Sequence, residues 1–219
     1  MFEFAEQDLD KCLKKLNQLN SDPTIHGIII QYPAFPSWNY DQLLENLDPK
    51  KDVDGFLPNS PFSGATALAI WEMLTAFAYL TGFKKTENFL KGKKIVLLGK
   101  GKAAGGPTFK LLSEKGFQVT VVEKDTQNPT AIIKSGDIVI SATGVKNIVN
   151  KSNLKKGSFV VGVGVGKEMV NGQEKIYGDI KEDEVSKIAK LYCPTIGGIG
   201  PLTIACLLKN VVESAKGAS

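Results

Sequence analysis

The 219-residue sequence is poor in cysteine and histidine. Its three cysteines, Cys12, Cys193 and Cys206, are widely spaced and odd in number. They predict neither a disulfide framework nor a zinc knuckle, no metal site is expected, and a reduced, cytoplasmic setting is the default. The one histidine, His26, stands at the start of an apolar run, which favours a packed or capping role over a catalytic one.

Targeting and membrane signals are also missing. The first residues, MFEFAEQDLDKCLKK, do not have the basic-then-apolar order of a signal peptide. The longest apolar run, 65–79, is too short to span a bilayer and carries Glu72. The net charge of +4 is mild and the basic residues are spread along the chain, so no nucleic-acid partner and no membrane partner are expected. An anionic small ligand remains compatible with this charge.

The chain is long enough for one large domain or two small ones, with a substantial core. Leucines at helical spacing predict an amphipathic helix over 6–20. The apolar run 25–31 predicts a buried parallel strand. A short helix is expected over 40–47 and a long apolar helix over 66–80, with a domain boundary inside 60–92.

From Lys93 onward, strands and helices alternate. Strands are predicted over 93–99, 118–123, 137–144 and 158–166. Helices are predicted over 108–116, 128–136, 182–190 and 202–215, and 192–201 reads as a turn-rich loop. The alternation implies an α/β fold with a Rossmann-type, doubly wound, mostly parallel sheet, preceded by a smaller α/β domain.

The clearest site signal is a glycine loop between a strand and a helix. Gly99, Gly101 and Gly105 follow IVLL directly, in the pattern Gly-x-Gly-x-x-Ala-Gly. Glycines there allow a tight turn and let backbone N–H groups approach a pyrophosphate at the positive end of a helix dipole. A glycine turn without a ligand is the alternative. A Walker A loop is excluded because no Gly-Lys-Ser/Thr stands at the required spacing.

The choice between NAD and NADP rests on the charges near this loop. Glu123 closes the next strand, where an acid can hold a ribose 2′-hydroxyl and repel a 2′-phosphate, so it favours NAD. Lys100, Lys102 and Lys124 argue for NADP because they can neutralise that phosphate. The expected cofactor is therefore NAD or NADP, with NAD slightly favoured.

Three further patterns allow more than one interpretation. The small residues that end the strand at Gly144 suit a sheet edge crossed by a nucleotide, or simply a tight strand end. The glycine-dense segment 197–201 lets backbone approach a ligand, or is a mechanical loop. Tyr177 and Lys181 have the Tyr-x-x-x-Lys spacing of short-chain dehydrogenases, but Gly178-Asp179 disfavours the helix that this motif needs, so we interpret it as coincidence.

Several motifs keep one order over nearly the whole chain. They are LNSDPTIHGIIIQYPAFP (19–36), KDVDGF (51–56), GKGKAAGGP (99–107), GDIVISATG (136–144), YGDI (177–180) and PTIGGIGPLT (194–203). Together they resemble the bifunctional methylenetetrahydrofolate dehydrogenase/methenyltetrahydrofolate cyclohydrolase family (FolD). KDVDGF is identical to the family's motif, and its combination with GGIGPLT in this order is highly specific.

The sequence also departs from the family pattern. The family's catalytic lysine lies in a Tyr-x-x-x-Lys segment upstream of all these motifs, and neither that segment nor the first strand and helix of the substrate domain has a counterpart here. The arginine-serine of the family's cofactor loop is Lys100-Gly101, and its later histidine-serine is Glu123-Lys124. The proline of its Pro-Gly-Gly-Val-Gly-Pro motif is Ile196.

The resemblance implies roles for individual residues. Gln31 and Asp54 would hold the folate and are the expected catalytic residues, with Asp54 accepting hydrogen bonds from the pterin. Asp52 is expected to be structural. Further substrate-binding residues would be Gly198, Gly200, Pro201 and Leu202. The expected cofactor-binding residues are Gly99, Lys100, Gly101, Gly105, Glu123, Lys124, Gly144 and Thr203.

The resemblance further implies three segments: a partial folate domain over 1–75, an NAD(P)-binding Rossmann domain over 76–201, and a C-terminal helix, 202–219, that returns to the first domain. The expected activity is oxidation of 5,10-methylenetetrahydrofolate with NAD(P), with an impaired cyclohydrolase step because the lysine segment is absent. A catalytically silent nucleotide-binding module and an internal-start fragment of a full-length enzyme are the alternatives. The folate substrate and a homodimer or complementing chain are the expected partners.

Overall fold

The structure, a computed structural model, describes residues 1–217 and divides the chain into two compact units. The first unit comprises Met1–Ala65 and the chain from Ala205 onward, and the second comprises Thr66–Ile204. No helix among the described residues is long and apolar enough to cross a membrane. The functional domain ranges expected from the family resemblance stay predictions.

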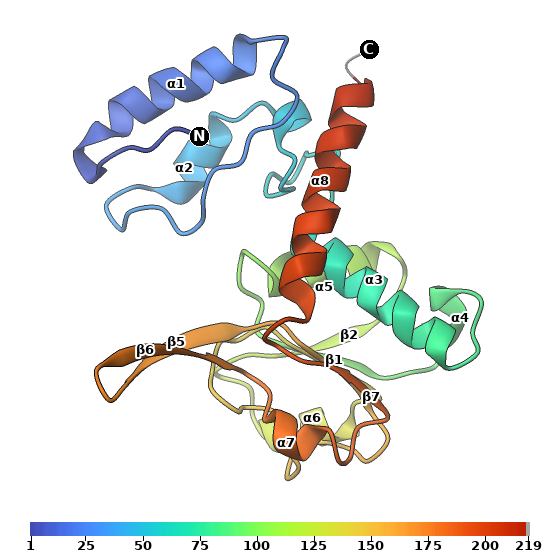
Figure 1. Ribbon diagram of the computed structural model, residues 1–219. Helices are drawn as coiled ribbons and strands as arrows, with labels where there is room; N and C mark the ends of the chain where they lie inside the picture. Colours follow the sequence, from blue (N-terminus) through green and yellow to red (C-terminus); the bar gives the residue numbers. More distant parts are fainter. Residues whose placement is uncertain (218–219) are drawn as a thin grey trace. The chain divides into compact units, whose positions relative to one another are not determined.

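The second unit is built on a five-stranded parallel sheet (Figure 1). Its strands are β1 (Ile95–Leu98), β2 (Val119–Val122), β3 (Ile138–Ser141), β4 (Phe159–Gly162) and β7 (Leu191–Cys193). The strand order is β2-β1-β3-β4-β7, and every neighbouring pair is parallel. The predicted α/β, doubly wound, mostly parallel sheet is therefore confirmed.

Helices cover both faces of this sheet (Figure 1). On one face Val96, Val139 and Val160 form a buried cluster with residues of α6 (Pro129–Ser135) and α7 (Glu182–Val185). On the other face lie α3 (Ala65–Leu80), α4 (Thr86–Leu90) and α5 (Gly105–Glu114). There Phe77 and Phe89 both place their rings against Phe159, at centroid distances of 5.8 and 4.8 Å. Two covered faces explain why β1, β3 and β4 are buried at every position.

The segment predicted as one strand over 158–166 belongs to two elements, so that prediction is wrong in its extent. β4 ends at Gly162, and β5 (Val165–Val170) pairs with β6 (Gln173–Gly178) in a separate antiparallel hairpin. Asn171 and Gly172 both have positive φ, of 54° and 77°, which is the backbone of a two-residue hairpin turn. The chain leaves the sheet after Gly162 because the N–H groups of Val163 and Gly164 both donate to the Ser141 carbonyl.

The first unit contains η1 (Glu6–Asp8), α1 (Leu9–Ser21), α2 (Tyr40–Glu45) and η2 (Pro49–Lys51), together with most of α8 (Ile199–Gly217). The Asn39 side chain caps α2 by accepting from the N–H groups of Asp41 and Gln42. Residues Leu16, Ile28, Tyr40, Leu44, Leu47 and Leu57 form the buried core of this unit.

The predicted strand over 25–31 is not a strand. Its only ladder contact is a parallel bridge between Ile28 and Asp52, with the Ile28 N–H donating to the Lys51 carbonyl at 2.7 Å. An apolar run forms a strand only where another backbone supplies hydrogen bonds along its length, and here the partner segment turns into η2 at Lys51. Ile29 is consequently 47% exposed.

Polar side chains fasten the segments of the first unit together. The Lys51 ammonium donates to the carbonyls of Leu19, Asn20 and Asp22 at 2.8, 2.6 and 2.7 Å, which satisfies the C-terminal end of α1. The buried Asn210 amide on α8 donates to the Val53 carbonyl at 2.9 Å. It also donates to the Ser63 carbonyl at 3.1 Å, so α8 holds both sides of the segment 53–63.

Candidate active site

The glycine loop between β1 and α5 contains two glycines that packing requires and one that it does not. Gly99 has φ +81°, and a Cβ there would lie 2.8 Å from the Ala142 carbonyl oxygen. A Cβ on Gly105 would collide with the Gly99 carbonyl. Gly101 has no atom within 4 Å of the position of a Cβ and does not have positive φ. Its surroundings therefore suit the close approach of a ligand rather than of another segment.

This loop lies at the point where the strand order reverses. β2 lies on one side of β1 and β3 lies on the other, and the register sets Leu98 level with Val122 and Ser141. In open parallel sheets, ligands bind beyond the carboxyl ends of the strands at such a switch point. Gly144, with φ +68°, follows β3 at the same edge. The structure thus brings together the predicted cofactor residues Gly99, Gly101, Gly105 and Gly144.

The start of α5 faces this edge without a side-chain cap. Its N-cap residue is Ala104, which makes no side-chain hydrogen bond to the helix, and the first N–H groups of a helix attract anions. The donor set and the side-chain-free approach at Gly101 fit the pyrophosphate of a dinucleotide.

The charged residues predicted to read the ribose lie beside this loop. Glu123 and Lys124 follow β2 and are exposed, and the Glu123 N–H donates to the Thr126 hydroxyl at 2.8 Å. The Gly99 N–H donates to the Val122 carbonyl at 2.9 Å, so the two strand ends are adjacent. The Lys100 ammonium lies 4.0 Å from the centre of the Phe109 ring, an arrangement that holds this lysine against α5.

The glycine-dense segment before α8 is shorter than predicted because α8 begins at Ile199 rather than at 202. Pro201 lies in the first turn, where a proline removes no helical hydrogen bond. Gly198 is required by packing, since a Cβ there would lie 2.6 Å from the Cys193 sulfur. Gly200 has no atom within 4 Å of a Cβ position.

The remaining residues predicted in this segment, Leu202 and Thr203, lie in the first two turns of α8. Leu202 is half-buried, and the Thr203 hydroxyl donates to the Ile199 carbonyl at 3.1 Å. That hydroxyl is therefore already used within the helix. Together with Gly198, Gly200 and Pro201, these residues follow β7, which is separated from β3 by β4.

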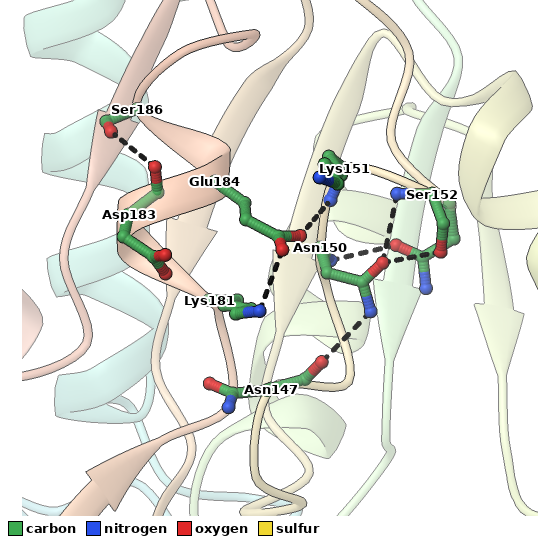
Figure 2. A network of polar contacts seen from close by, with 9 residues as sticks. Asn147, Asn150, Lys151, Ser152, Lys181, Asp183, Glu184 and Ser186 are labelled. Carbon is green, nitrogen blue, oxygen red and sulfur yellow. Dashed lines mark hydrogen bonds and ion pairs between the residues drawn. The ribbon is translucent and has the colours of Figure 1, made fainter.

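Lys181 belongs to a polar network around α7 (Figure 2). The Lys181 ammonium pairs with the Glu184 carboxylate at 2.7 Å, which raises the pKa of Lys181. Glu184 also accepts the Lys151 N–H at 3.2 Å, so α7 is tied to the loop after β3 (Figure 2). Tyr177 lies in β6 rather than on a helix, which agrees with interpreting the Tyr-x-x-x-Lys spacing as coincidence.

One charged residue at this edge escaped the sequence analysis. Asp179 is 0% exposed and lies in the YGDI segment, directly after β6. The only sequence signal was its place in a segment shared with the family, because nothing in the local pattern indicates that an aspartate is buried.

Two aspartates of the first unit have different environments. Asp52 is 1% exposed and accepts the N–H groups of Gly55 at 3.1 Å and Leu57 at 2.7 Å. Asp54 is half-buried, and burial together with the nearby Asp52 carboxylate raises its pKa to about 6. Asp52 therefore organises the turn, while Asp54 is a carboxyl group whose charge is held at a cost.

Gln31 and Asp54 lie next to residues of one aromatic cluster. Tyr32 and Phe56 place their rings 4.9 and 5.8 Å from the ring of Tyr40, whose hydroxyl donates to the Ile30 carbonyl at 2.8 Å. The Gln31 side chain is exposed and lines an apolar cavity of about 990 Å³. Among residues 1–217 no three His, Cys, Asp or Glu side chains are grouped so that they could hold a metal ion.

Comparison with known proteins places these features in one family. The model of the tetrahydrofolate dehydrogenase/cyclohydrolase NAD(P)-binding domain matches residues 65–219. The model of the catalytic domain of the same family matches residues 2–54. The sequence is 33% identical to Bifunctional protein FolD 2 of Geobacter sulfurreducens, over 97% of this chain and 73% of that protein. It is 36% identical to Bifunctional protein FolD of Mycoplasma pneumoniae, over 91% of this chain and 70% of that protein.

Solved structures agree with the sequence comparison. The bifunctional FolD enzyme of Campylobacter jejuni is similar with a TM-score of 0.84 at 34% identity, covering 95% of this chain and 73% of that one. The FolD enzyme of Trypanosoma brucei, solved in complex with NADP and an inhibitor, is similar with a TM-score of 0.83 at 29% identity, covering 94% and 72%. The family resemblance is confirmed: this chain belongs to the tetrahydrofolate dehydrogenase/cyclohydrolase family.

Proposed function

We propose that this chain oxidises 5,10-methylenetetrahydrofolate to 5,10-methenyltetrahydrofolate, with NAD as the preferred hydride acceptor. The observation that carries the proposal is the glycine loop at the switch point, where Gly99 and Gly105 are required by packing and Gly101 is not. When bound, the cofactor supplies the nicotinamide C4 that accepts the hydride from the methylene carbon of the folate.

The residues of the chain bind and orient rather than donate or accept protons. Backbone N–H groups at the start of α5 would hold the pyrophosphate, and Glu123 would accept a hydrogen bond from a ribose hydroxyl. A Cβ at Gly200 would meet no protein atom, so the backbone there is accessible to a flat ring, whereas the Cβ position of Gly144 lies 3.0 Å from the Val165 carbonyl oxygen. Because this oxidation needs mainly the alignment of two rings, residues that position the cofactor and the folate are sufficient for hydride transfer.

Asp54 and Gln31 would bind the folate. The Asp54 carboxylate offers two acceptors to the adjacent N–H groups of a pterin, and its partial burial strengthens such hydrogen bonds. Leu202 and Pro201, at the first turn of α8, would add apolar contacts.

The preference for NAD is supported by the composition of the basic residues. All 27 residues of the Lys/Arg class are lysine, so no guanidinium can grip a 2′-phosphate with two parallel hydrogen bonds. Lys100 is held against Phe109, and Glu123 would repel the phosphate. A cytoplasmic location belongs to the same proposal, since all three cysteines are free thiols.

A homodimer through the β5–β6 hairpin is the proposed assembly. Val165, Met169 and Ile176 share one face of the hairpin and are 57, 69 and 57% exposed. Lys167 and Glu174 pair at 2.8 Å on that same face, which gives a second copy both an apolar patch and opposite charges to match. The alternative to this homodimer is an assembly with a complementing chain of different sequence.

The activity itself is the first test. The purified chain mixed with 5,10-methylenetetrahydrofolate and NAD is expected to reduce the nicotinamide, with a higher kcat/KM for NAD than for NADP. Glu123→Gln should shift this ratio toward NADP by about tenfold, because it removes a like charge beside the phosphate. Glu114→Gln, an exposed acid on α5, is the control and should leave the ratio unchanged.

The same assay separates the alternatives. Cofactor binding without turnover would make the chain a silent nucleotide-binding module. Decay of the methenyl product measures whether the second step, hydrolysis of the methenyl group, takes place.

Gly101→Ala should weaken cofactor binding without weakening the fold. An added Cβ at Gly101 meets no protein atom, but it would stand where backbone must approach the pyrophosphate, so the Kd for NAD should rise about tenfold or more. Thermal unfolding should be unchanged within the error of the control Gly217→Ala, another glycine with free space around it. Unchanged NAD affinity in Gly101→Ala would contradict the placement of the cofactor.

Asp54→Asn should lower folate affinity and raise stability. Asp54 titrates at about 6 instead of its ordinary 3.8, so the folded state favours the protonated form and loses stability as pH rises between these values. The variant should therefore unfold at a higher temperature than wild type at pH 7 to 8, with no difference below pH about 4. The KM for the folate should rise about tenfold or more, since a charged acceptor is lost.

Asp52→Asn is the matched control for this prediction. It leaves one of the two N–H groups that Asp52 accepts without an acceptor and should destabilise the fold by about 1–3 kcal/mol. Equal stability changes in the two variants would show that Asp54 is merely structural.

The proposed dimer is tested by measuring the molecular mass of the protein in solution. Met169→Glu places a charge in the exposed apolar face and should convert a dimer to a monomer in sedimentation equilibrium, while Lys175→Glu on the opposite face should not. A wild-type monomer would reject this assembly.

A further inference from the structure

The buried carboxylate of Asp179 joins three strand ends of the parallel sheet. Its Oδ2 atom accepts the Thr143 N–H at 3.2 Å and the Gly164 N–H at 3.1 Å. Its Oδ1 atom accepts the Thr195 hydroxyl at 3.3 Å. Thr143 follows β3, Gly164 follows β4 and Thr195 follows β7, so one side chain fixes the exits of three strands.

The backbone of Asp179 is itself held in place. Its N–H donates to the Gly164 carbonyl and its carbonyl accepts the Val149 N–H, both at 3.1 Å. Two residues further along the chain, Lys181 donates its N–H to the Val149 carbonyl at 2.8 Å and pairs with Glu184 in the network around α7 (Figure 2). The carboxylate is therefore presented from a rigid base.

Glycines make room for this carboxylate. A Cβ on Gly164 would lie 2.5 Å from Asp179 Oδ2, and a Cβ on Gly178 would lie 2.6 Å from the Thr195 Cβ. Contacts this close leave no space for a side chain at Gly164 or Gly178 in this arrangement of the three segments. The position of Asp179 thus determines where the backbone of Thr143 and Thr195 can run.

Both threonines lead directly into candidate binding segments. Thr143 precedes Gly144, and Thr195 precedes the glycines that open α8. The inference rests on the proposed function, in which these segments border the cofactor. We propose that Asp179 is a positioning residue whose carboxylate holds the segments 143–144 and 195–200 in the geometry that binds the nicotinamide cofactor.

The ionisation of Asp179 should then be visible in cofactor binding. Burial raises its pKa to about 6, against the opposing effect of the polar groups of Ser141, Thr143, Gly164 and Thr195. A protonated carboxyl group loses acceptor capacity, so cofactor affinity should fall as pH falls through about 6.

The other titratable groups near Asp179 have partners or pKa values that distinguish them from it. The Glu182 carboxylate accepts the Thr195 N–H at 3.2 Å. Burial, together with the negative charge of Glu182, raises the pKa of the Cys193 thiol to about 11, so this thiol does not titrate near pH 6. Lys181 is paired with Glu184, and Lys146 is paired with Glu168 on the hairpin.

The test is the Kd of the full chain for NAD and NADP, measured by calorimetric titration without folate between pH 5 and 8. Asp179→Asn keeps the shape of the side chain, but its amide nitrogen cannot accept the hydrogen bonds. We expect the Kd to rise about tenfold or more and to lose its dependence on pH near 6, whereas wild type keeps that dependence.

Asp137→Asn is the matched control. Its carboxylate lies before β3 at the opposite end of the strands, where it accepts the Lys94 N–H at 2.9 Å and pairs with Lys155 at 2.5 Å. This variant should lose stability without changing the cofactor Kd or its pH dependence. An Asp179→Asn variant with wild-type Kd and pH profile would overturn the proposal, and so would an equal effect of Asp137→Asn.

Two further measurements test the role of Asp179 if the first variant does not fold or if the wild type binds no cofactor. If Asp179→Asn does not fold, Thr195→Val removes one hydrogen bond and should weaken NAD binding several-fold, with Thr195→Ser restoring it. Unaltered binding in Thr195→Val would then overturn the proposal.

If wild type binds neither NAD nor NADP, the proposed function fails while the positioning role is still measurable. Amide hydrogen exchange at Thr143 and Gly164 should accelerate in Asp179→Asn and not in Asp137→Asn. Equal exchange in both variants would overturn the positioning role.

Discussion

The close approach of three backbone segments at the carboxyl edge of the sheet is the constraint on which the rest of the second unit depends. Gly105 packs against the Gly99 carbonyl, and Gly99 packs against Ala142, so α5 starts immediately beside the ends of β1 and β3. No side chain larger than hydrogen fits at either contact. The same closeness places the N–H groups of α5 at the switch point, where an anionic ligand gains most from them.

The chemistry proposed here uses carboxylates that the fold holds at a cost. Asp54 and Asp179 both have a pKa raised to about 6, chiefly by burial, and each is ionised at neutral pH despite that burial. Asp52, two residues before Asp54, is the contrasting case, because its two carboxylate oxygens already accept hydrogen bonds from backbone N–H groups. Two kinds of carboxylate are thus proposed to carry function. The oxygens of Asp54 are available to accept hydrogen bonds from a ligand. Those of Asp179 accept hydrogen bonds from the segments proposed to bind the cofactor.

Much of this could be read from the sequence, because the signals were local. The glycine loop after an apolar strand, the alternation of strands and helices, and the KDVDGF segment each depend on residues close together in the chain. What could not be read depended on distant partners. The run 25–31 has the composition of a strand but finds one bridge at Ile28, and β7 has only three residues, too few for a periodic signal. Asp179 is buried by segments 15 or more residues away, which no local pattern encodes.

The proposed reaction moves a hydride from a folate to a nicotinamide. The most direct measurement uses 5,10-methylenetetrahydrofolate deuterated at the methylene carbon, with mass spectrometry of the nicotinamide product. Direct hydride transfer predicts one deuterium in the reduced nicotinamide and a slower rate with the labelled substrate. Reduced nicotinamide without deuterium, or no reduction with either NAD or NADP, would contradict it.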